Sequence, residues 1–364
     1  MRVCLVLGPS AGGVGAHVRS LAAGLVARGH AVTVLGPRET TARFAFEGTG
    51  AAVVSLEISD AVRPGRDARA VRTLRANLRG SDVLHAHGLR AGLVGVAADR
   101  VPARGGHRIP LVVTWHNAVL ASGPRAVALS VLERVVARGA DVTLAASSDL
   151  AERARRLGAR DVRDAPVSAP ALPAPARSPD EVRTRLGLGD DPLVLAVGRL
   201  APQKDYPTLL DAAARWREIG PVVAIAGAGP LDGQLRHRVE SEHLRVLLLG
   251  SRDDVADLLA AADVVVVPSR WEARALVAQE ALRAGVPLVA SRVGGLPELV
   301  GDAAVLVPPA DPVALAGSVE RILGDPALAA RLRAAGPARA ATWPGPEQTV
   351  EQVAAVYSAL TGAS

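Results

Sequence analysis

The first half of the chain alternates short apolar runs with longer stretches of helical periodicity. The runs are rich in Val and Leu, as expected for strands that a parallel sheet buries on both faces. They cover residues 3–7, 31–35, 51–56, 82–87, 110–116 and 141–147. The pattern therefore predicts a doubly wound α/β domain over residues 1–164.

The second half repeats this scheme after an interruption. Residues 165–179 are rich in proline and lack helical periodicity, which indicates a linker between domains. Further apolar runs follow at residues 193–198, 221–227, 246–250, 263–269, 287–291 and 303–308. We predict two Rossmann-like domains that face each other across a cleft. The second covers residues 180–364, and its last helix is free to pack back on the first domain.

The composition is that of a folded, two-domain protein. With 364 residues and 49% hydrophobic content, the chain can bury a large core. Its apolar runs are too short to cross a membrane, and the amino terminus has the pattern of a strand instead of a signal peptide. We therefore expect a cytoplasmic protein. Cys4 is the single cysteine, which excludes a disulfide framework and a cysteine-based metal site.

Positive charge is concentrated in the first half. Residues 1–164 carry 23 Arg against 13 acidic residues, a balance of +10, whereas residues 165–364 carry 19 basic and 23 acidic residues, a balance of −4. The whole chain has eight aromatic residues, so a basic surface with aromatic stacking groups for nucleic acid is not expected. An anionic acceptor or an acidic membrane surface remains as a partner for the positive half.

Six arginines flank an apolar stripe within residues 63–79. The stripe consists of Val71, Leu74 and Leu78. The arginines are Arg63, Arg66, Arg69, Arg72, Arg75 and Arg79. The ordinary interpretation is a core-packed helix with a solvated basic surface. The alternative is peripheral contact of this segment with the inner membrane surface or with a lipid-phosphate acceptor.

Residues 8–18 form a glycine-rich loop that follows the first strand and opens a helix. Backbone amides and the helix dipole can hold an anion at such a position. Gly13 and Gly15 have the spacing of a dinucleotide fingerprint, but Val18 stands where its third glycine belongs. The loop therefore disfavours a dehydrogenase.

Lys204 is the single lysine among 42 basic residues. A chain that otherwise uses arginine has kept one compact ammonium group, which favours a site where a planar guanidinium does not fit. Lys204 and Arg199 follow the apolar run at 193–198, at the end of a strand where parallel sheets bind ligands. The pattern predicts a phosphate site, the alternative being a lysine left on the surface by chance.

Two glutamates, Glu272 and Glu280, follow the apolar run at 263–269. On a continuous helix they would lie roughly 12 Å apart along the axis and about 80° apart around it. This separation suits the two ends of one extended ligand, with Glu272 on a hexose and Glu280 on a ribose. The alternative is a capping Glu followed by a solvent-facing Glu.

Three histidines, His85, His87 and His116, lie near strand ends of the first half. Such a cluster can bind a metal ion. No cysteine or paired carboxylate accompanies them, and no Asp-x-Asp element occurs, so no metal is expected. His87 is a candidate for the acceptor pocket, whereas His85 is expected to have the opposite strand parity and to pack in the core.

Several ordered motifs along nearly the whole chain carry a family resemblance. They are GGVGAHV near the start, VVTWHN at 112–117, VGRLAPQK at 197–204, AGAGPL at 226–231, and two glutamates separated by seven residues. With these motifs the chain resembles the retaining, nucleotide-sugar-dependent glycosyltransferases of family 4, which have the GT-B fold. In that family the amino-terminal domain binds the acceptor and the carboxyl-terminal domain binds the nucleotide sugar.

The resemblance implies a role for each matching residue. The catalytic residues would be His116, Glu272, Arg199 and Lys204, with His116 on a donor-sugar hydroxyl and the two cations on the diphosphate. The donor site would comprise Gly13, Arg199, Lys204, Glu272, Leu276 and Glu280. The acceptor site would include Gly15 and His87. No metal and no cofactor besides the nucleotide sugar are implied.

One segment departs from the family pattern. Ala273, Arg274 and Ala275 stand where the family usually has Gly-Phe-Gly, so two positions have gained a side chain. The sequence leaves the identity of the donor sugar open, and Arg274 is expected to point to solvent. Two alternatives to hexosyl transfer with retention therefore stay open. One is a related enzyme that makes a non-glycosidic bond, or hydrolyses or epimerises a nucleotide sugar, and the other is a non-catalytic binding protein.

Overall fold

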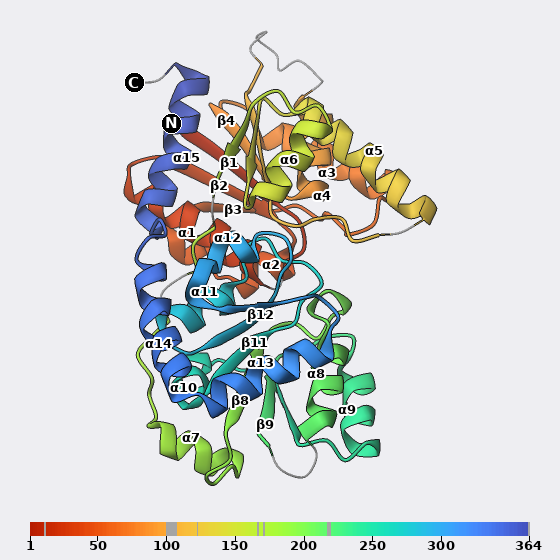
Figure 1. The fold of residues 1–364 in the computed structure, drawn as a ribbon. Coiled ribbons are helices and arrows are strands. Elements are labelled where there is room, and N and C mark those ends of the chain that lie inside the picture. Colours follow the sequence, from red (N-terminus) through yellow and green to blue (C-terminus); the bar gives the residue numbers. More distant parts are fainter. Residues whose placement is uncertain are drawn as a thin grey trace. The chain divides into compact units, whose positions relative to one another are not determined.

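The computed structural model describes residues 1–10, 12–99, 108–121, 123–165, 167–169, 172–216 and 220–362. The chain forms two compact units, shown as a ribbon in Figure 1. Unit 1 comprises Met1–Pro170 and Pro344–Ser364, and unit 2 comprises Ala171–Trp343. The carboxyl-terminal segment is thus part of unit 1. Unit 2 ends at Trp343, and the last helix packs within unit 1.

Unit 1 is built on a parallel sheet of seven strands in the order β3-β2-β1-β4-β5-β6-β7. All six runs predicted in this half form strands. The sequence analysis missed the seventh, β7, because its three residues include an Arg and an Asp and lack an apolar pattern. The strands are β1 (Arg2–Leu7), β2 (Ala31–Gly36), β3 (Ala52–Ser55), β4 (Val83–His87), β5 (Leu111–Trp115), β6 (Val142–Ala145) and β7 (Val162–Asp164).

Helices connect these strands and cover the sheet (Figure 1). They are α1 (Gly13–Ala27), α2 (Arg38–Arg43), the 3-10 turn η1 (Phe46–Thr49), α3 (Pro64–Asn77), α4 (Leu89–Asp99), α5 (Gly123–Gly139), α6 (Ser148–Arg156) and α15 (Pro346–Thr361). Helix α1 buries Val18, Leu21 and Leu25 in the core of unit 1. Helix α15 adds Val353 and Tyr357 to the same core, which is why the end of the chain belongs to this unit.

Helix α3 confirms most of the apolar stripe predicted within residues 63–79. Leu74 and Leu78 are buried, and Ala70 joins them, whereas Val71 is only partly buried. Arg75 is half-buried and donates hydrogen bonds to the carbonyl oxygens of Ala97 and Ala98. The other five arginines of the segment are exposed. The helix is therefore packed on one face and basic on the other.

Unit 2 repeats the topology with a six-stranded parallel sheet in the order β10-β9-β8-β11-β12-β13. Each strand coincides with an apolar run predicted in the second half. The strands are β8 (Leu193–Val197), β9 (Val222–Ala226), β10 (Val246–Gly250), β11 (Val264–Val267), β12 (Leu288–Ser291) and β13 (Val305–Val307). Both predicted sheets and the α/β class are confirmed.

The helices of unit 2 begin inside the predicted linker. Helix α7 starts at Pro179, where Ser178 and Glu181 form a capping box. The helices are α7 (Pro179–Leu186), α8 (Tyr206–Ala213), α9 (Asp232–Ser241), α10 (Val255–Ala261), α11 (Leu276–Arg283), α12 (Leu296–Val300), α13 (Pro312–Gly324) and α14 (Pro326–Ala340). Short 3-10 turns are η2 (Pro202–Lys204), η3 (Ala214–Trp216) and η4 (Gly301–Ala303).

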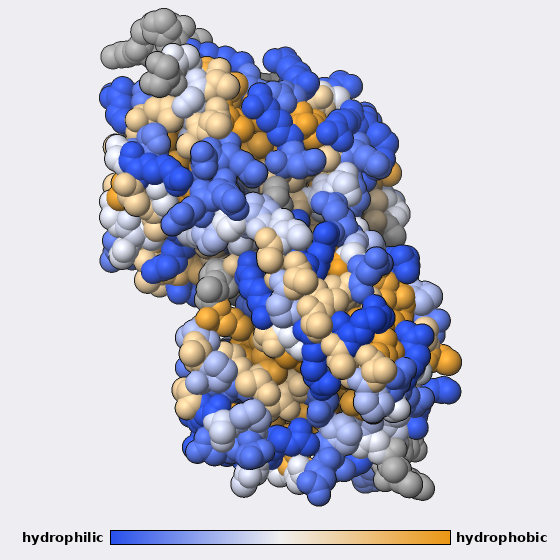
Figure 2. Space-filling model, turned by 60° about the vertical axis from the view of Figure 1, so that its left-hand side comes forward, coloured by the Kyte–Doolittle hydropathy of each residue, from blue (hydrophilic) through white to orange (hydrophobic). Residues whose placement is uncertain are grey.

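The surface mixes polar and apolar groups. On the face drawn in Figure 2, hydrophilic residues are spread widely and hydrophobic residues lie in smaller groups between them. Within the described part of the chain, no helix has both the length and the apolar character that crossing a bilayer requires.

Candidate functional site

Each sheet reverses its strand order at one point, and the predicted site residues gather there. In unit 2 this point lies between β8 and β11, which pair with each other while their crossovers lead to opposite sides. The loop after β8 carries Lys204, and the loop after β11 carries Glu272. Lys204 Nζ lies 2.6 Å from Glu272 Oε1, which forms an ion pair. The structure thus brings together two residues that the sequence separates by 68 positions.

Further hydrogen bonds fix the two loops around this pair. Ser269 Oγ donates to Glu272 Oε1 at 2.8 Å. Gln203 Nε2 donates to the carbonyl oxygen of Trp271 at 2.9 Å, and the amide of Arg270 donates back to the Gln203 carbonyl at 2.8 Å. The side chains of Lys204 and Glu272 are therefore held by a network and not by one flexible contact. The sequence analysis missed Gln203 and Ser269: Gln203 lies within the motif at 197–204 but was assigned no role, and Ser269 belongs to none of the motifs.

Close backbone contacts require glycine at this edge of the sheet. Gly294 has a φ of +50°, and a Cβ on it would lie 2.1 Å from the carbonyl oxygen of Glu272. The next amide, of Gly295, donates to that same oxygen at 2.8 Å. A side chain at position 294 would push away the backbone that positions Glu272.

Glu280 lies apart from this pair, on α11. No hydrogen bond or ion pair between described residues joins it to Lys204 or Glu272. Burial raises the pKa of the Glu280 carboxyl, and the nearby Arg283 guanidinium opposes this shift.

Leu276 is the first residue of α11, and Ala275 at the N-cap has no side-chain oxygen to cap the helix. The backbone amides of the first turn of α11, beginning at Leu276, are therefore available to bind an anion.

Arg199 is exposed beyond β8. Its side chain forms no hydrogen bond or ion pair with another described residue, in contrast to Lys204. The structure therefore does not bring the two predicted phosphate-binding cations together through a shared contact.

The departure from the family pattern causes no backbone strain. Ala275 has a φ of −57°, which any residue adopts, and Ala273 is not among the residues with positive φ. Arg274 is half-buried, so the expectation that it points to solvent is wrong. Burial lowers the pKa of its guanidinium to about 10, with Arg339 and Arg283 acting in the same direction and Glu298 opposing them. Arg274 therefore belongs to a charged group inside unit 2.

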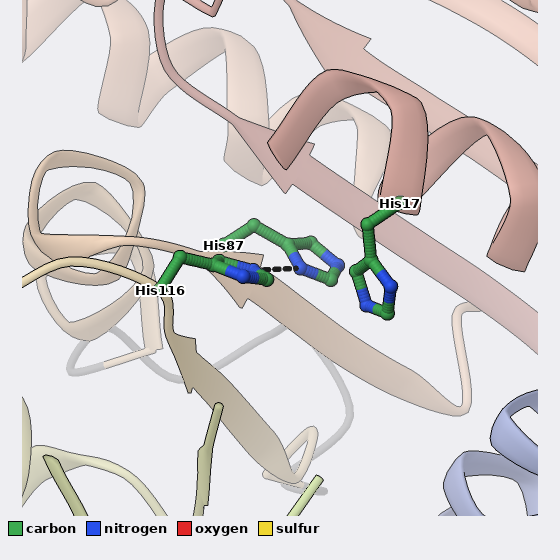
Figure 3. A group of neighbouring side chains, drawn as sticks. All are labelled: His17, His87 and His116. Carbon is green, nitrogen blue, oxygen red and sulfur yellow. Dashed lines mark hydrogen bonds between the residues drawn. The ribbon is translucent and has the colours of Figure 1, made fainter. Parts of the chain in front are cut away.

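In unit 1 the strand order reverses between β1 and β4, and three histidines meet at this point (Figure 3). His87 ends β4, His116 directly follows β5, and His17 lies on α1. His87 Nδ1 lies 3.1 Å from His116 Nε2. The His17 ring approaches both others edge-on, with centroid separations of 5.8 Å to His87 and 5.3 Å to His116. One nitrogen of each ring lies within 4.8 Å of one nitrogen of the others.

His85 lies beneath this group as a core residue. Its Nδ1 is 2.6 Å from Tyr357 Oη on α15, and its Nε2 is 2.7 Å from Thr114 Oγ1 on β5. The prediction that His85 packs in the core is therefore confirmed. The assumed parity is wrong, because residues two apart on a strand share a face and the His85 and His87 rings are only 4.1 Å apart.

All four imidazoles are neutral over the ordinary pH range. Burial lowers the pKa of His17 to about 4 and that of His85 to about 3. The pKa values of His87 and His116 are lowered well below the usual value, first by burial and then by neighbouring histidines. A neutral imidazole offers one N–H donor and one lone pair. The cluster can therefore bind hydroxyl groups or a metal ion without first losing protons.

The predicted glycines open α1 but differ in their surroundings. Gly13 is the first residue of the helix, next to Gly12 at the N-cap. Gly15 is buried, and its amide donates to Ser10 Oγ at 3.0 Å. A Cβ on Gly15 would lie 2.1 Å from the Phe44 ring. Close packing therefore explains Gly15, and its role toward the acceptor stays a prediction.

His17 is the residue of this group that the sequence analysis missed. It lies on the buried face of α1, one turn before Leu21 and next to Val18. A polar residue on the core stripe of a helix is a signal in itself, because a buried imidazole needs partners. The nearness to His87 and His116 appears only when the helix packs across the sheet.

Two sequence families match the chain. The glycosyl transferase 4-like domain matches residues 12–170, and glycosyl transferases group 1 matches residues 179–339. A D-inositol 3-phosphate glycosyltransferase of Thermomonospora curvata is 35% identical over 314 residues, which cover 76% of this chain and 71% of the relative. An alpha-D-kanosaminyltransferase of Streptomyces kanamyceticus is 36% identical over 160 residues, or 42% of each protein.

Solved structures share the fold over the whole chain. HepE of Anabaena, in complex with UDP and glucose, has a TM-score of 0.84 and 22% identity and covers 98% of this chain and 99% of its own. Sucrose-phosphate synthase of Thermosynechococcus elongatus has a TM-score of 0.81 and 25% identity, with both chains covered completely. Together with the two switch-point sites, these matches show that the chain belongs to the family 4 glycosyltransferases of the GT-B fold.

Proposed function

We propose that the protein transfers a hexosyl group from a nucleotide-diphosphate sugar to an acceptor hydroxyl, with retention of configuration and without a metal ion. The Lys204–Glu272 ion pair at the switch point of unit 2 is the observation that carries this proposal. It joins a cation suited to a diphosphate with a carboxylate suited to sugar hydroxyls.

Lys204 and Arg199 stabilise the negative charge that develops on the departing diphosphate. The bond between the sugar C1 and the phosphate oxygen breaks, and the acceptor oxygen attacks C1 from the same face. The acceptor proton passes to the leaving phosphate oxygen, so no separate base is required. The amides at the start of α11, from Leu276 onward, add to the charge stabilisation.

Glu272 and Glu280 orient the two ends of the donor. Glu272 accepts hydrogen bonds from the hexose, with Lys204 and Ser269 fixing its carboxylate. Glu280 accepts hydrogen bonds from the ribose. Its half-buried position supports this role, because a carboxylate gains most from hydroxyl partners where water is excluded.

Unit 1 supplies the acceptor side in this proposal. His116 contacts a donor-sugar hydroxyl, while His87 and Gly15 line the acceptor pocket, and Gly13 binds a phosphate or the edge of the acceptor. Buried, neutral imidazoles support these roles because each has a donor and an acceptor for hydroxyl groups. The names of the relatives favour a phosphorylated cyclitol as the first acceptor to examine. The neighbouring structures favour a UDP-sugar as the first donor.

The decisive experiment measures nucleoside diphosphate release from UDP-, GDP- and ADP-sugars with and without candidate acceptors. A thermal-shift screen selects the donor first, because a ligand that binds only the folded state raises the apparent stability. Acceptor-dependent release supports the proposal. Release without any acceptor favours a hydrolase, and binding without turnover favours a binding protein. Chelator in the assay leaves the rate unchanged if transfer is independent of metal.

A further inference from the structure

Unit 1 contains a compact, buried histidine cluster, made of His17, His87 and His116. They come from α1, β4 and the end of β5, and their rings are turned toward one another in Figure 3. Their relative exposures are only 3–6%. One ligand nitrogen of each ring lies within 4.8 Å of those of the other two.

One fully buried nitrogen in this set has no partner among the described residues. His87 Nδ1 faces His116 Nε2 at 3.1 Å, whereas His87 Nε2 is buried and forms no hydrogen bond to any described residue. If Nδ1 carries the proton, Nε2 presents a bare lone pair. If Nε2 carries the proton, an N–H is left without an acceptor. A buried polar atom without a partner is costly, and it marks a place where a ligand would be favoured.

We propose that His17, His87 and His116 bind one Zn²⁺ ion through one nitrogen of each ring. Three histidines and one open position form a well-known zinc geometry. Imidazole ligands suit Zn²⁺, Cu²⁺ and Ni²⁺ and do not suit Mg²⁺ or Ca²⁺.

The rings need only a small adjustment. Zn–N bonds of about 2.0–2.1 Å place tetrahedral ligand atoms roughly 3.3 Å apart. The His87 and His116 rings already lie close together, with Nδ1 of His87 3.1 Å from Nε2 of His116. The ligand nitrogens, which all lie within 4.8 Å of one another, must close by up to about 1.5 Å to reach the zinc spacing, a change within the reach of side-chain rotations.

His17 also lines a small pocket between α1 and α15, together with Ser20, Thr349 and Val350. One of the three rings therefore borders an opening in unit 1.

Zinc at this site blocks sugar transfer, a consequence that rests on the proposed function. His116 and His87 cannot bind sugar hydroxyls and a metal ion with the same lone pairs. The bound ion is therefore an inhibitor and not a cofactor, which agrees with transfer that needs no metal.

The first test measures metal binding with no donor or acceptor present. Titration of the purified, metal-free protein with Co²⁺ should give the intense visible bands of a four-coordinate ion at one equivalent per chain, and Zn²⁺ should displace it. His17→Gln should abolish the bands and weaken Zn²⁺ binding by about 100-fold or more. The matched control is His237→Gln, which removes an exposed histidine of unit 2 and should bind like the wild type.

The second test measures how Zn²⁺ changes the rate of sugar transfer. Zn²⁺ should inhibit the wild type and His237→Gln, and His17→Gln should lose this inhibition. Absence of stoichiometric Co²⁺ binding by the wild type would overturn the site, as would equal binding by a folded His17→Gln protein. Binding without inhibition would overturn the blocking step and count against His116 in the proposed function. If no donor is turned over at all, the titration still decides the metal site.

Discussion

The two switch points have the same topology but opposite chemistry. In unit 2 the point between β8 and β11 holds a charged pair, Lys204 and Glu272, cross-linked by loop hydrogen bonds. In unit 1 the point between β1 and β4 holds neutral imidazoles packed against one another. The sheet places ligand-binding loops at both points, but it does not decide what these loops bind.

The two sites differ in how their polar groups compensate for the hydration that they lose on burial. In unit 2 the Lys204 ammonium and the Glu272 carboxylate are each other's counter-ion. The histidines have no such partner, so burial lowers their pKa values and leaves them neutral. Unit 2 is therefore suited to a charged diphosphate, and unit 1 to hydroxyl groups or to a metal ion.

The largest effect is expected from Gly294→Ala in unit 2. A left-handed backbone costs an alanine about 1 to 2 kcal/mol, and crowding against the Glu272 carbonyl adds about 1 to 3 kcal/mol. The free energy of unfolding in urea measures the sum. Gly317 is the control, because it lies in α13 with open space around it. Gly317→Ala should stabilise by up to about 1 kcal/mol. Equal stability of both variants would show that Gly294 does not position the Glu272 loop.

Lys204→Ala should remove about 2 to 4 kcal/mol of transition-state stabilisation, because it deletes the diphosphate cation and leaves Glu272 without its counter-ion. Steady-state kinetics of the folded variant measure this loss as a fall in kcat/KM. Lys204→Arg is the sharper variant. It keeps the charge, so a comparable loss shows that the site requires the compact ammonium group. Unchanged kinetics in Lys204→Ala would remove this residue from the site.

Glu280→Ala and Glu272→Ala should separate the two ends of the donor. Loss of a hydrogen-bonded carboxylate costs about 1.5 to 3 kcal/mol of binding free energy. Glu280→Ala should weaken both free nucleoside diphosphate and the nucleotide sugar, whereas Glu272→Ala should weaken only the sugar. Calorimetric titration of both variants with both ligands tests this. The same loss of free nucleotide affinity in the two variants contradicts the assignment.

Tyr357→Phe tests the buried hydrogen bond beneath the histidine cluster of unit 1. Its hydroxyl lies 2.6 Å from His85 Nδ1 in the core of unit 1, and removing it leaves a buried nitrogen without its partner. We expect a stability loss of about 1 to 3 kcal/mol in chemical denaturation. Tyr206→Phe in unit 2 is the matched control, since Tyr206 is similarly buried as a residue and its hydroxyl forms no hydrogen bond to another described residue. If both variants lose the same stability, the His85 contact contributes nothing specific.

The smallest effect concerns the basic face of α3. Each arginine near an anionic bilayer contributes about 1 kcal/mol of attraction. Under the ordinary interpretation, a solvated face, the protein should not co-sediment with anionic liposomes at low salt. Salt-sensitive binding that falls when Arg66, Arg69 and Arg72 are changed to Gln would support peripheral membrane contact instead. Neutral liposomes are the control.

The sequence alone predicted most of the fold. Val- and Leu-rich runs form a strand wherever a parallel sheet buries both faces, so all twelve predicted runs became strands. Strand β7 escaped because it lies at the edge of the sheet, where burial does not impose an apolar pattern. Helix α7 begins at the last residue of the predicted linker, since Pro179 is also a favourable first residue of a helix.

The sequence also pointed to individual residues but not to their partners. The lone lysine and the two glutamates could be found by composition and spacing. Only the tertiary structure pairs Lys204 with Glu272, because the contact joins loops from two different strands. It likewise adds His17 to His87 and His116, since α1 must first pack across the sheet. Periodicity determines which elements form and which faces they bury. Contacts between distant segments, and the pKa values that burial sets, exist only once the chain has folded.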